Sequence, residues 1–384
     1  MYEYFQQQLT DKEISHNFRT IKEYHPIDAV RVVYDDREYL MMASNNYLGL
    51  TFDSRVQSAA IEAVQKYGTG SGGARLVSGT FPLFTELERA IAKFKYSESA
   101  LIFNTGYMAN VGTIAALCDK NSIVFSDALN HASIIDGCRL SKAAIQTYRH
   151  CDTEHLTYLL NNVPKDTHKL IVTDGVFSMD GDIAPLDTLY ELSREYNALI
   201  MVDDAHATGV IGEGHGTSAH FGLDGLVDIQ LGTLSKALGS VGGYVAASKI
   251  IVDYLVNFSR SFIFSTALSP ADIGAALAAL NLIETDIDIY ERLQANVAYM
   301  ARALGTFGIE STDTTPIFPI IIGKNEDALA VSHSLWKSGI IGTAIRPPTV
   351  PVGESRIRLT VTAAHTREQI DYVCRSLQQA MSNI

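Results

Sequence analysis

The stretch ALIMVDDAHATG, residues 198–209, sets a short apolar run directly before two aspartates and a histidine. The apolar run predicts a buried strand. Polar residues at its end predict a site, because ligands collect beyond the strand ends of open α/β sheets. A buried carboxylate is costly unless a cation meets it. Successive side chains of a strand face opposite sides, so Asp203 and Asp204 are expected to have separate roles.

Similar apolar runs alternate with helical segments from about residue 83 onwards. Short apolar strands separated by helices indicate a parallel or mostly parallel sheet with both faces covered. The sequence therefore predicts an α/β fold. The other runs are ALIFN (100–104), SIVFSD (122–127), KLIVTDGVFS (169–178) and DIQLGTLS (228–235).

The chain is expected to divide into three parts. Residues 1–50 form an N-terminal arm and a segment of a smaller domain, and residues 51–270 form the large α/β domain. Residues 271–384 form a C-terminal α+β domain with a linking helix, because strand-like PIFPIII (316–322) and SRIRLTVTA (355–363) precede a final helix. Within the large domain, apolar residues at helical spacing predict a helix over 53–67 that Asp53 or Ser54 could cap.

The bulk composition excludes several classes of partner. A formal net charge of −13 without a long basic run argues against nucleic acid and anionic membrane surfaces. Because the N-terminus MYEYFQQQLTDKE is polar and acidic, we do not expect it to be a signal peptide, and no apolar run is long enough to span a bilayer. We therefore expect a cytoplasmic enzyme. The cysteines lack zinc-like spacing and predict reduced thiols and no metal site: Cys118, Cys138, Cys151 and Cys374.

A glycine-rich stretch, GTGSGGARLVSG (68–79), fits the G-x-G-x-x-G spacing of dinucleotide sites through Gly68, Gly70 and Gly73. That fingerprint belongs in a turn from a strand into a helix, whereas these glycines follow a predicted helix. A NAD or FAD oxidoreductase is therefore disfavoured. The remaining interpretations are a flexible turn, or a loop that lets backbone approach a substrate or a neighbouring subunit.

Three further segments carry residues with chemistry. In NTGYMAN (104–110), Gly106 lies at a turn into a helix whose N–H groups favour a phosphate, and Tyr107 could face a flat ring. His131 lies between a strand and a helical run, and Lys236 lies among small neutral residues beside Thr233. Each alone has an ordinary interpretation as a turn, a structural histidine or a solvated lysine.

Taken together, these segments supply the groups that pyridoxal 5′-phosphate (PLP) requires. A desolvated lysine is a nucleophile for carbonyl groups. The cofactor needs that amine, an acid for its pyridinium nitrogen, phosphate donors and a platform for its ring. Lys236, Asp203, Gly106 and His131 are the candidates for these functions.

Two segments, MVDDAHATGVIG (201–212) and GTLSKALGSVGGY (232–244), closely resemble the α-oxoamine synthases, which are fold-type I PLP enzymes. The resemblance implies a large domain with a mostly parallel seven-stranded sheet between helices, and a smaller α+β C-terminal domain. Within the family, TAIRPPTVPVGESRIRLTVTAAHT (343–366) is similar to the member of the biotin pathway. The resemblance spans nearly the whole chain, including ASNNYLGL (43–50), GSGGARLVSGT (70–80), LNHASIIDG (129–137) and FIFSTALSP (262–270).

The resemblance also implies roles around the cofactor ring. Lys236 holds PLP through an imine and acts as the base, and Asp203 pairs with the pyridinium N–H. His206 donates a hydrogen bond to the phenolic oxygen, Ser178 lies in the same region, and His131 stacks on the ring and assists the acyl oxygen.

By the same resemblance, the phosphate and the substrates have their own residues. Gly106, Tyr107 and Thr233 hold the phosphate, and Thr266 reaches the phosphate of the neighbouring subunit. The glycine-rich loop lies at the subunit interface. For the substrates, Arg346 binds the amino acid carboxylate with Thr349 nearby, Arg19 helps hold the acyl substrate, and Asn46 lies close to the site.

The implied reaction is a PLP-dependent decarboxylative condensation of L-alanine with a pimeloyl thioester, releasing CO₂ and the thiol carrier. The enzyme is expected to be a homodimer with its active site at the subunit interface. The carrier, coenzyme A or acyl-carrier protein, stays open. So do two alternatives: a family member that uses glycine or serine, and a PLP-binding regulator without turnover.

Overall fold

The computed structural model describes residues 1–309, 311 and 314–382. Its internal contacts define two compact units. The larger unit contains Asn46–Ser178 and Asp182–Glu291, and the smaller contains Met1–Asn45, Met179–Gly181 and Arg292–Ile384.

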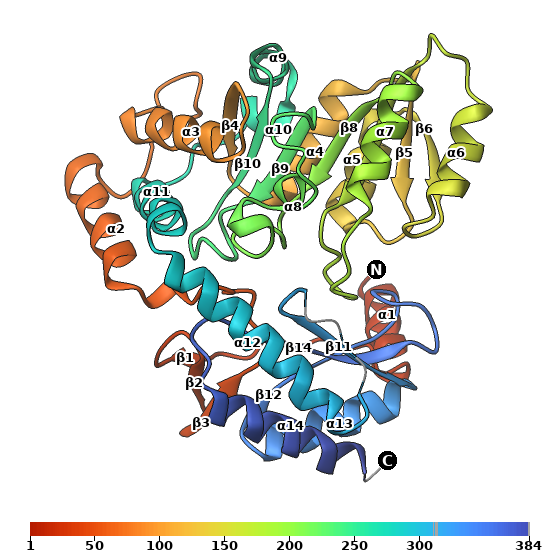
Figure 1. Cartoon of the computed structure of the whole chain (residues 1–384). Helices are drawn as coiled ribbons and strands as arrows, with labels where there is room; N and C mark the ends of the chain where they lie inside the picture. Colours follow the sequence, from red (N-terminus) through yellow and green to blue (C-terminus); the bar gives the residue numbers. More distant parts are fainter. Residues whose placement is uncertain (310, 312–313, 383–384) are drawn as a thin grey trace. The chain divides into compact units, whose positions relative to one another are not determined.

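The larger unit is built on a seven-stranded sheet in the order β4-β10-β9-β8-β7-β5-β6 (Figure 1). The strands from β9 to β6 in this order are all parallel to one another, and β10 runs antiparallel to both β4 and β9. The predicted mostly parallel seven-stranded sheet is therefore confirmed. Its strands are β4 (Ser99–Phe103), β5 (Ser122–Asp127), β6 (Ala144–Tyr148), β7 (His168–Asp174), β8 (Leu199–Asp203), β9 (Ile229–Thr233) and β10 (Gly243–Ala247).

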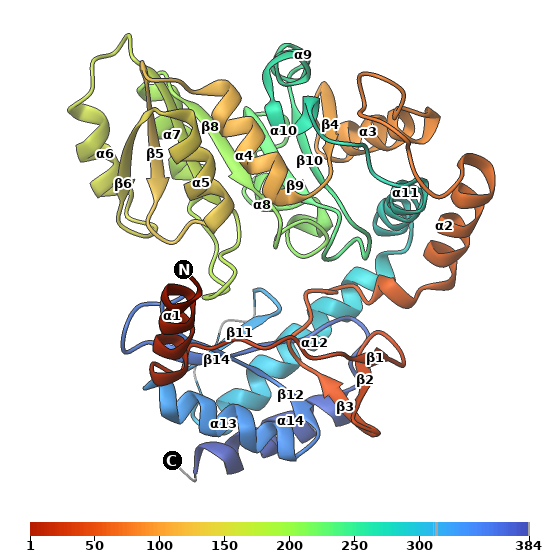
Figure 2. The same cartoon turned by 180° about the vertical axis from the view of Figure 1, so that it is seen from behind.

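Successive side chains of a strand point to opposite faces of the sheet, and both faces of this sheet are apolar. In β8, Met201 joins a core cluster with α4, α5, α9 and α10, whereas Ile200 and Val202 join a second cluster with α6 and α7. Figure 1 shows α7 in front of the sheet, and Figure 2, from behind, shows α4 there. These helices are α4 (Gly106–Leu117), α5 (Ala132–Ser141), α6 (Thr153–Asn161), α7 (Leu186–Glu195), α9 (Lys249–Phe258) and α10 (Arg260–Ile263).

The parallel register brings polar residues together at the carboxyl ends of the strands. Asp174 ends β7 and pairs in register with Asp203 at the end of β8. Asp127 ends β5 and Thr233 ends β9. The carboxyl ends of these strands therefore carry a row of acidic and hydroxyl side chains, which is where ligands of open α/β sheets bind.

Helix α11 (Pro270–Thr285) begins at residue 270, the predicted end of the large domain, and belongs to the larger unit. It packs against α2 (Ser54–Tyr67) and α3 (Pro82–Phe94) inside the larger unit. The approach to α2 is close, because a Cβ built on Gly274 would lie 2.8 Å from the carbonyl oxygen of Ala59. The larger unit therefore continues past residue 270, to Glu291. Helix α2 itself begins as predicted, with the Asp53 side chain accepting the Arg55 N–H.

The smaller unit has two sheets, in the orders β1-β2-β3-β12 and β11-β14-β13. In the first, β3 and β12 are parallel and the other pairs are antiparallel, and the second is antiparallel throughout. Its strands are β1 (His25–Pro26), β2 (Arg31–Tyr34), β3 (Arg37–Met41), β11 (Ile317–Gly323), β12 (Ile340–Ile341), β13 (Thr343–Ile345) and β14 (Ser355–Thr360).

Helices complete the smaller unit. Helix α14 (Arg367–Met381) begins at a reciprocal capping box between Thr366 and Gln369. Helix α1 (Tyr2–Ile14) has no buried residue, α13 (Asn325–Lys337) packs against β13 and β14, and α12 (Ile287–Gly305) contains the boundary of the two units. Among the described residues, every helix is too short or too polar to cross a bilayer.

Candidate active site

Asp203 lies at the end of β8 on the face of the sheet that α4 covers. Its Oδ2 accepts a hydrogen bond from Nδ2 of Asn110 at 2.6 Å, and its Oδ1 accepts the Ala205 N–H at 2.9 Å. The residue is only 3% exposed. Burial raises the pKa of Asp203, while the Asn110 hydrogen bond and the Lys236 charge oppose this shift. The carboxylate is thus held in place and needs a nearby cation.

His131 lies beside this carboxylate as the N-cap of α5. Its Nδ1 is 2.7 Å from Oγ of Ser133, and its backbone N–H donates to Oδ2 of Asp174 at 2.7 Å. Burial lowers the pKa of His131; the Asp203 charge opposes the shift and the Lys236 charge adds to it. The imidazole is therefore biased towards its neutral form.

Lys236 adds a positive charge to the residues at the carboxyl ends of these strands. It is half-buried after β9, and its charge acts on Asp203, His131 and Asp174. Asp174 is buried, and burial together with the Asp203 charge raises its pKa well above the usual value. The structure therefore brings together Lys236, Asp203 and His131, which the sequence analysis singled out for the cofactor ring.

His206 and its neighbours come from the turn after β8 and from the start of the larger unit. His206 is buried, with Nδ1 2.6 Å from the hydroxyl oxygen of Tyr47. Asn46, which precedes Tyr47, donates from Nδ2 to Oγ1 of Thr51 at 2.8 Å. Ser178 is half-buried and lies at the end of the segment that follows β7.

The predicted phosphate residues gather where α4 begins. Thr105 caps the helix by accepting the Met108 N–H at 3.0 Å, and a Cβ built on Gly106 would lie 3.4 Å from Cβ of Thr233. Thr233 is buried and its hydroxyl donates to the Gly242 carbonyl at 2.8 Å. The start of α4 and the end of β9 are therefore adjacent, and the N–H groups of a helix N-terminus favour a phosphate.

Tyr107, also predicted for the phosphate side, is 46% exposed and its hydroxyl donates to Asp136. This hydrogen bond raises the pKa of the phenol. In the single chain the tyrosine thus lies on the outer side of the helix start, on the same segment as Gly106 but directed towards α5.

Thr266 lies against the glycine-rich loop. It forms an isolated backbone bridge with Ala74, and its carbonyl accepts from Nδ2 of Asn104 at 2.6 Å. Within the loop, a Cβ on Gly73 would lie 2.3 Å from Oγ of Ser78, and one on Gly79 would lie 2.1 Å from the Gly73 carbonyl oxygen. Tight folding of the loop on itself therefore explains these two glycines without a dinucleotide.

Asp204 has a different environment from Asp203, as the strand periodicity predicts. Its Oδ2 accepts from Nζ of Lys95 at 2.8 Å, and its Oδ1 accepts from Oγ1 of Thr217 at 2.6 Å. Both side chains of the ion pair are fully buried. Burial is the largest influence on the pKa of Lys95 and lowers it, but the charges and hydrogen bonds of Asp204 and Tyr244 together outweigh it, and the net shift is upward. Asp204 is therefore a structural anion.

The smaller unit carries the predicted substrate residues Arg19, Arg346 and Thr349, which line one cavity of about 640 Å³. Burial and the nearby Arg19 charge lower the pKa of Arg346. Within the described residues, Nε of Arg346 is buried without a hydrogen-bond partner. Two cations and an unsatisfied donor suit an anionic ligand. Lys22 also lines the cavity, with Nζ 3.6 Å from the ring centroid of Trp336.

Three polar residues of this site were not singled out from the sequence: Asn110, Asp174 and Tyr47. Asn110 lies one helical turn after Gly106 in the quoted NTGYMAN segment, and that spacing could have indicated it. Asp174 ends an apolar strand, as Asp203 does, so the same argument applies to it. Tyr47 lies in a turn-rich segment distant in sequence from His206, and nothing in the local pattern points to their contact.

The residues present fit PLP. A protonated ring nitrogen would be the cation that buried Asp203 requires, and Lys236 is the amine whose charge acts on the same group. The start of α4 offers a phosphate site beside Thr233. This fit rests on the chemistry of the donor set.

The fold and this arrangement define a class of protein. The chain belongs to the class I and II aminotransferase family, whose family model matches residues 37–377. Within this family, it falls among proteins named 8-amino-7-oxononanoate synthase, which confirms the resemblance found in the sequence. One from Lysinibacillus sphaericus is 49% identical over 350 residues, which cover 91% of this chain and 90% of that protein.

Solved structures confirm the fold class. A variant of serine palmitoyltransferase from S. paucimobilis with bound PLP has a TM-score of 0.93 at 33% identity, covering 100% of this chain and 97% of that one. An 8-amino-7-oxononanoate synthase from Francisella tularensis has a TM-score of 0.77 at 29% identity, covering 90% of this chain and 98% of that one.

Proposed function

We propose that this protein is a PLP-dependent 8-amino-7-oxononanoate synthase of biotin biosynthesis. It condenses L-alanine with a pimeloyl thioester, carried by coenzyme A or acyl-carrier protein, to give 8-amino-7-oxononanoate, CO₂ and the free thiol. The observation that carries the proposal is the buried Asp203 carboxylate within the electrostatic reach of Lys236 and His131 at one sheet edge. The 49% identity to a synthase of this name supports the choice of reaction.

Residues of the larger unit would hold the cofactor. When bound, PLP supplies an electron sink that stabilises negative charge at the amino acid Cα. Lys236 is its attachment point and Asp203 keeps the ring nitrogen protonated. His206 binds the phenolic oxygen in the region of Ser178, and Gly106, Tyr107 and Thr233 bind the phosphate. Thr266 binds the phosphate of the cofactor in the neighbouring subunit.

The chain's own residues then perform the proton and binding steps. The Lys236 amine takes the proton from Cα of the bound amino acid and returns one to the product. His131, biased towards its neutral form, would provide the platform for the cofactor ring and would donate a hydrogen bond to the acyl oxygen. Asn110 and Ala205 fix the Asp203 carboxylate by their hydrogen bonds, so its orientation is set before substrate binds.

Substrate recognition falls to Arg346, Thr349, Arg19 and Asn46. Arg346 binds the amino acid carboxylate with Thr349 nearby, and Arg19 contributes to holding the acyl substrate, with Asn46 close to the reacting groups. The shared cavity of Arg19 and Arg346 supports binding of anionic groups. A homodimer with the active site at the subunit interface, and a cytoplasmic location, belong to the same proposal.

Product analysis tests this proposal. The holoenzyme is incubated with L-alanine and pimeloyl-coenzyme A, or with pimeloyl-acyl-carrier protein, and the product is identified by mass. Carboxyl-labelled alanine is expected to release labelled CO₂. Lys236→Ala is expected to abolish turnover and the cofactor's visible absorbance, whereas Lys249→Ala, at an exposed surface lysine paired with Asp253, retains both. Full activity of Lys236→Ala contradicts the proposal.

A second candidate is a related synthase that uses serine or glycine. The TM-score of 0.93 to serine palmitoyltransferase favours keeping it. Parallel assays of L-alanine, L-serine and glycine with pimeloyl- and palmitoyl-coenzyme A separate the candidates. The proposed function predicts the highest kcat/KM for the alanine and pimeloyl pair, and preference for serine with the long acyl chain selects the alternative.

A further inference from the structure

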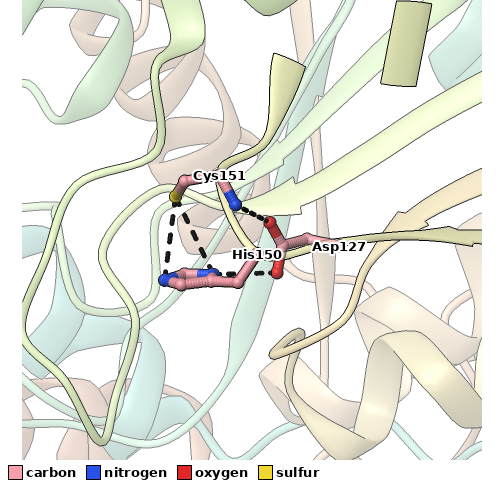
Figure 3. Close-up of side chains that lie close together, drawn as sticks. All are labelled: Asp127, His150 and Cys151. Atoms are coloured by element: carbon pink, nitrogen blue, oxygen red, sulfur yellow. Dashed lines mark hydrogen bonds and ion pairs between the residues drawn. The ribbon is translucent and has the colours of Figure 1, made fainter. Parts of the chain in front are cut away.

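A second cluster of chemically reactive side chains consists of residues that have no assigned function towards PLP (Figure 3). His150 and Cys151 lie in the turn after β6, and Asp127 ends the adjacent strand β5. The candidate ligand atoms of these three residues lie within 4.8 Å of one another. Asp182, in the segment between β7 and α7, also faces His150.

Two aspartates hold the His150 ring from its two nitrogens. Nδ1 lies 3.0 Å from Oδ1 of Asp127, and Nε2 lies 2.7 Å from Oδ2 of Asp182. The ring also packs edge-on against Phe177, with centroids 4.4 Å apart and an interplanar angle of 88°. Nδ1 therefore interacts with the Asp127 carboxylate, and Nε2 interacts with the Asp182 carboxylate.

Cys151 lies close to both ring nitrogens of His150, with Sγ 3.8 Å from Nδ1. Its Sγ lies 3.7 Å from Nε2 of His150 and 3.9 Å from Oδ2 of Asp182. Its backbone has a positive φ of 52°, and its N–H donates to Oδ2 of Asp127 at 2.8 Å. Asp127 thus holds both the imidazole and the cysteine, as Figure 3 shows.

An independent observation points to a missing partner. Within the described residues, Oδ1 of Asp182 is a buried atom without a hydrogen-bond partner. A carboxylate oxygen removed from water without a partner is costly. A cation bound between Asp182, His150 and Cys151 would interact with this carboxylate and offset that cost.

We propose that Sγ of Cys151, Nε2 of His150 and the carboxylate of Asp182 bind a divalent zinc-type cation, with Asp127 as the positioning residue for His150. Sulfur, imidazole nitrogen and carboxylate oxygen are the ligands that Zn²⁺ takes in proteins. A carboxylate on the far ring nitrogen is the usual support of a zinc-bound histidine. The fourth position is left to water.

Two of the three distances between the proposed ligand atoms are close to those around this ion. Zinc–ligand bonds of about 2.0–2.3 Å at tetrahedral angles place the ligand atoms about 3.3–3.6 Å apart. The distances from Sγ of Cys151, 3.7 Å to Nε2 of His150 and 3.9 Å to Oδ2 of Asp182, are within a few tenths of an ångström of that range. The third distance, 2.7 Å between Nε2 of His150 and Oδ2 of Asp182, is the present hydrogen bond, and it has to lengthen by about 0.6 Å when the metal replaces its proton. Sγ, which now lies 3.8 Å from Nδ1, also has to move away from that nitrogen, because a metal bound to Nε2 lies on the side of the ring opposite Nδ1.

Binding releases the Nε2–H proton of His150 and the thiol proton of Cys151 to solvent, because the ligands are neutral imidazole and thiolate. The two carboxylates that attract the protonated ring attract a metal cation at the same place for the same Coulombic reason. Solvent can reach the site, since the side chains of His150 and Asp182 are 26% and 38% exposed.

This site was missed from the sequence because its ligands do not follow a spacing rule. His150 and Cys151 are adjacent, Asp127 ends another strand, and Asp182 lies in the segment between β7 and α7. The spacing of the cysteines predicts no metal site, and a site at Cys151 departs from that prediction. It does not depend on the reaction proposed above.

The test uses tag-free holoenzyme that has been treated with a chelator and dialysed. Equilibrium dialysis against Zn²⁺ is expected to give one tightly held equivalent per chain. Cys151→Ala and His150→Gln are expected to lose it. The matched controls Cys118→Ala and His155→Gln, which change a buried thiol and a nearby histidine outside the cluster, are expected to keep it.

A spectroscopic measurement on the unaltered protein covers the case in which a variant fails to fold. Co²⁺ is expected to give the visible bands of a four-coordinate site and a thiolate charge-transfer band that alkylation of Cys151 removes. No bound equivalent above that of Cys151→Ala, or a Co²⁺ spectrum without a thiolate band, overturns the proposal.

Discussion

Asp203 and Asp204 are neighbours in the chain, yet their side chains lie in different environments. Asp203 faces α4 and is held by Asn110, whereas Asp204 forms a fully buried ion pair with Lys95. The period of two along a strand separates them. Substitution of each residue should therefore affect a different property of the protein.

For Asp203→Asn we expect a protein that still folds and binds PLP but has kcat lowered by about 100-fold or more. The amide cannot keep the ring nitrogen protonated, so electron withdrawal weakens. Stopped-flow or steady-state kinetics measure the change, and the thermal midpoint serves as the control. A rate near that of the parent would contradict the assigned role.

For Asp204→Asn we expect the opposite pattern, with lower stability and little direct effect on chemistry. The substitution leaves the Lys95 ammonium buried without its carboxylate, at a cost of about 3–5 kcal/mol in the free energy of unfolding. Urea unfolding of both variants makes the comparison. Equal stability of Asp204→Asn and the parent would show that Lys95 is not held by this pair.

His365 makes stability depend on pH. Burial lowers its pKa to about 4, and its Nδ1 accepts the Thr362 N–H at 3.0 Å. The unfolded chain, with a histidine pKa of about 6.5, binds a proton first as pH falls. The free energy of unfolding should therefore decrease between about pH 6.5 and 4, by about 3 kcal/mol in all, and change little through this group below pH 4.

Thermal midpoints measured across that range check the histidine prediction. His365→Gln should show a shallower decrease than the parent between pH 6.5 and 4.5, whatever its midpoint at neutral pH. His220→Gln, at a histidine on the short helix α8 (Thr217–His220), is the control and should keep the parent slope. Identical slopes in all three proteins would exclude His365 as the source.

At the scale of elements, helix α14 offers a local test. The Thr366 hydroxyl accepts the Gln369 N–H at 3.3 Å, and Oε1 of Gln369 accepts the Thr366 N–H at 2.9 Å. Thr366→Ala should lower the free energy of unfolding by about 1 kcal/mol, because the Gln369 N–H loses its side-chain acceptor. Thr366→Ser retains the hydroxyl and should behave nearly as the parent in urea unfolding.

The sheet was largely visible in the sequence, because its central strands are apolar runs between helices. Two strands were not singled out. β6 lies at the sheet edge and has a mostly exposed sequence, AIQTY, without an apolar run. β10, GYVAA, follows the glycines beside Lys236 and reads as a continuation of that loop. Strand propensity is weak evidence where an edge is solvated or residues are small.

The candidate site was predictable where its residues end strands or begin helices. Asp203, Gly106 and Thr233 occupy such positions, and the fold brings them to one edge. The pairing of Tyr47 with His206 joins segments that are far apart in sequence, so local patterns carry no information about it. The roles of Arg19 and Arg346 came from the resemblance alone.

At the scale of the whole molecule, the buried cysteines report on the two units. Cys118 and Cys138 lie in the larger unit and Cys374 in the smaller, and burial raises the pKa of each thiol to about 12. Since the thiolate is the reactive form, we expect slow alkylation of all three in the native protein.

Mass spectrometry of alkylated peptides at increasing urea concentrations tests this expectation. Cys374 should become reactive when the smaller unit opens, and Cys118 and Cys138 should become reactive together when the larger unit opens. Native-state labelling of the three thiols at the rate of a free thiol would contradict their burial.

The smaller unit combines both ends of the chain, and this has a consequence for synthesis on the ribosome. β3 pairs with β12, about 300 residues later, so at about 5–20 residues per second the N-terminal strand waits roughly 15–60 s for its partner to be translated. The larger unit is almost continuous in sequence and can form in the meantime. The nascent N-terminal strands are thus the segment with the greatest need of a chaperone.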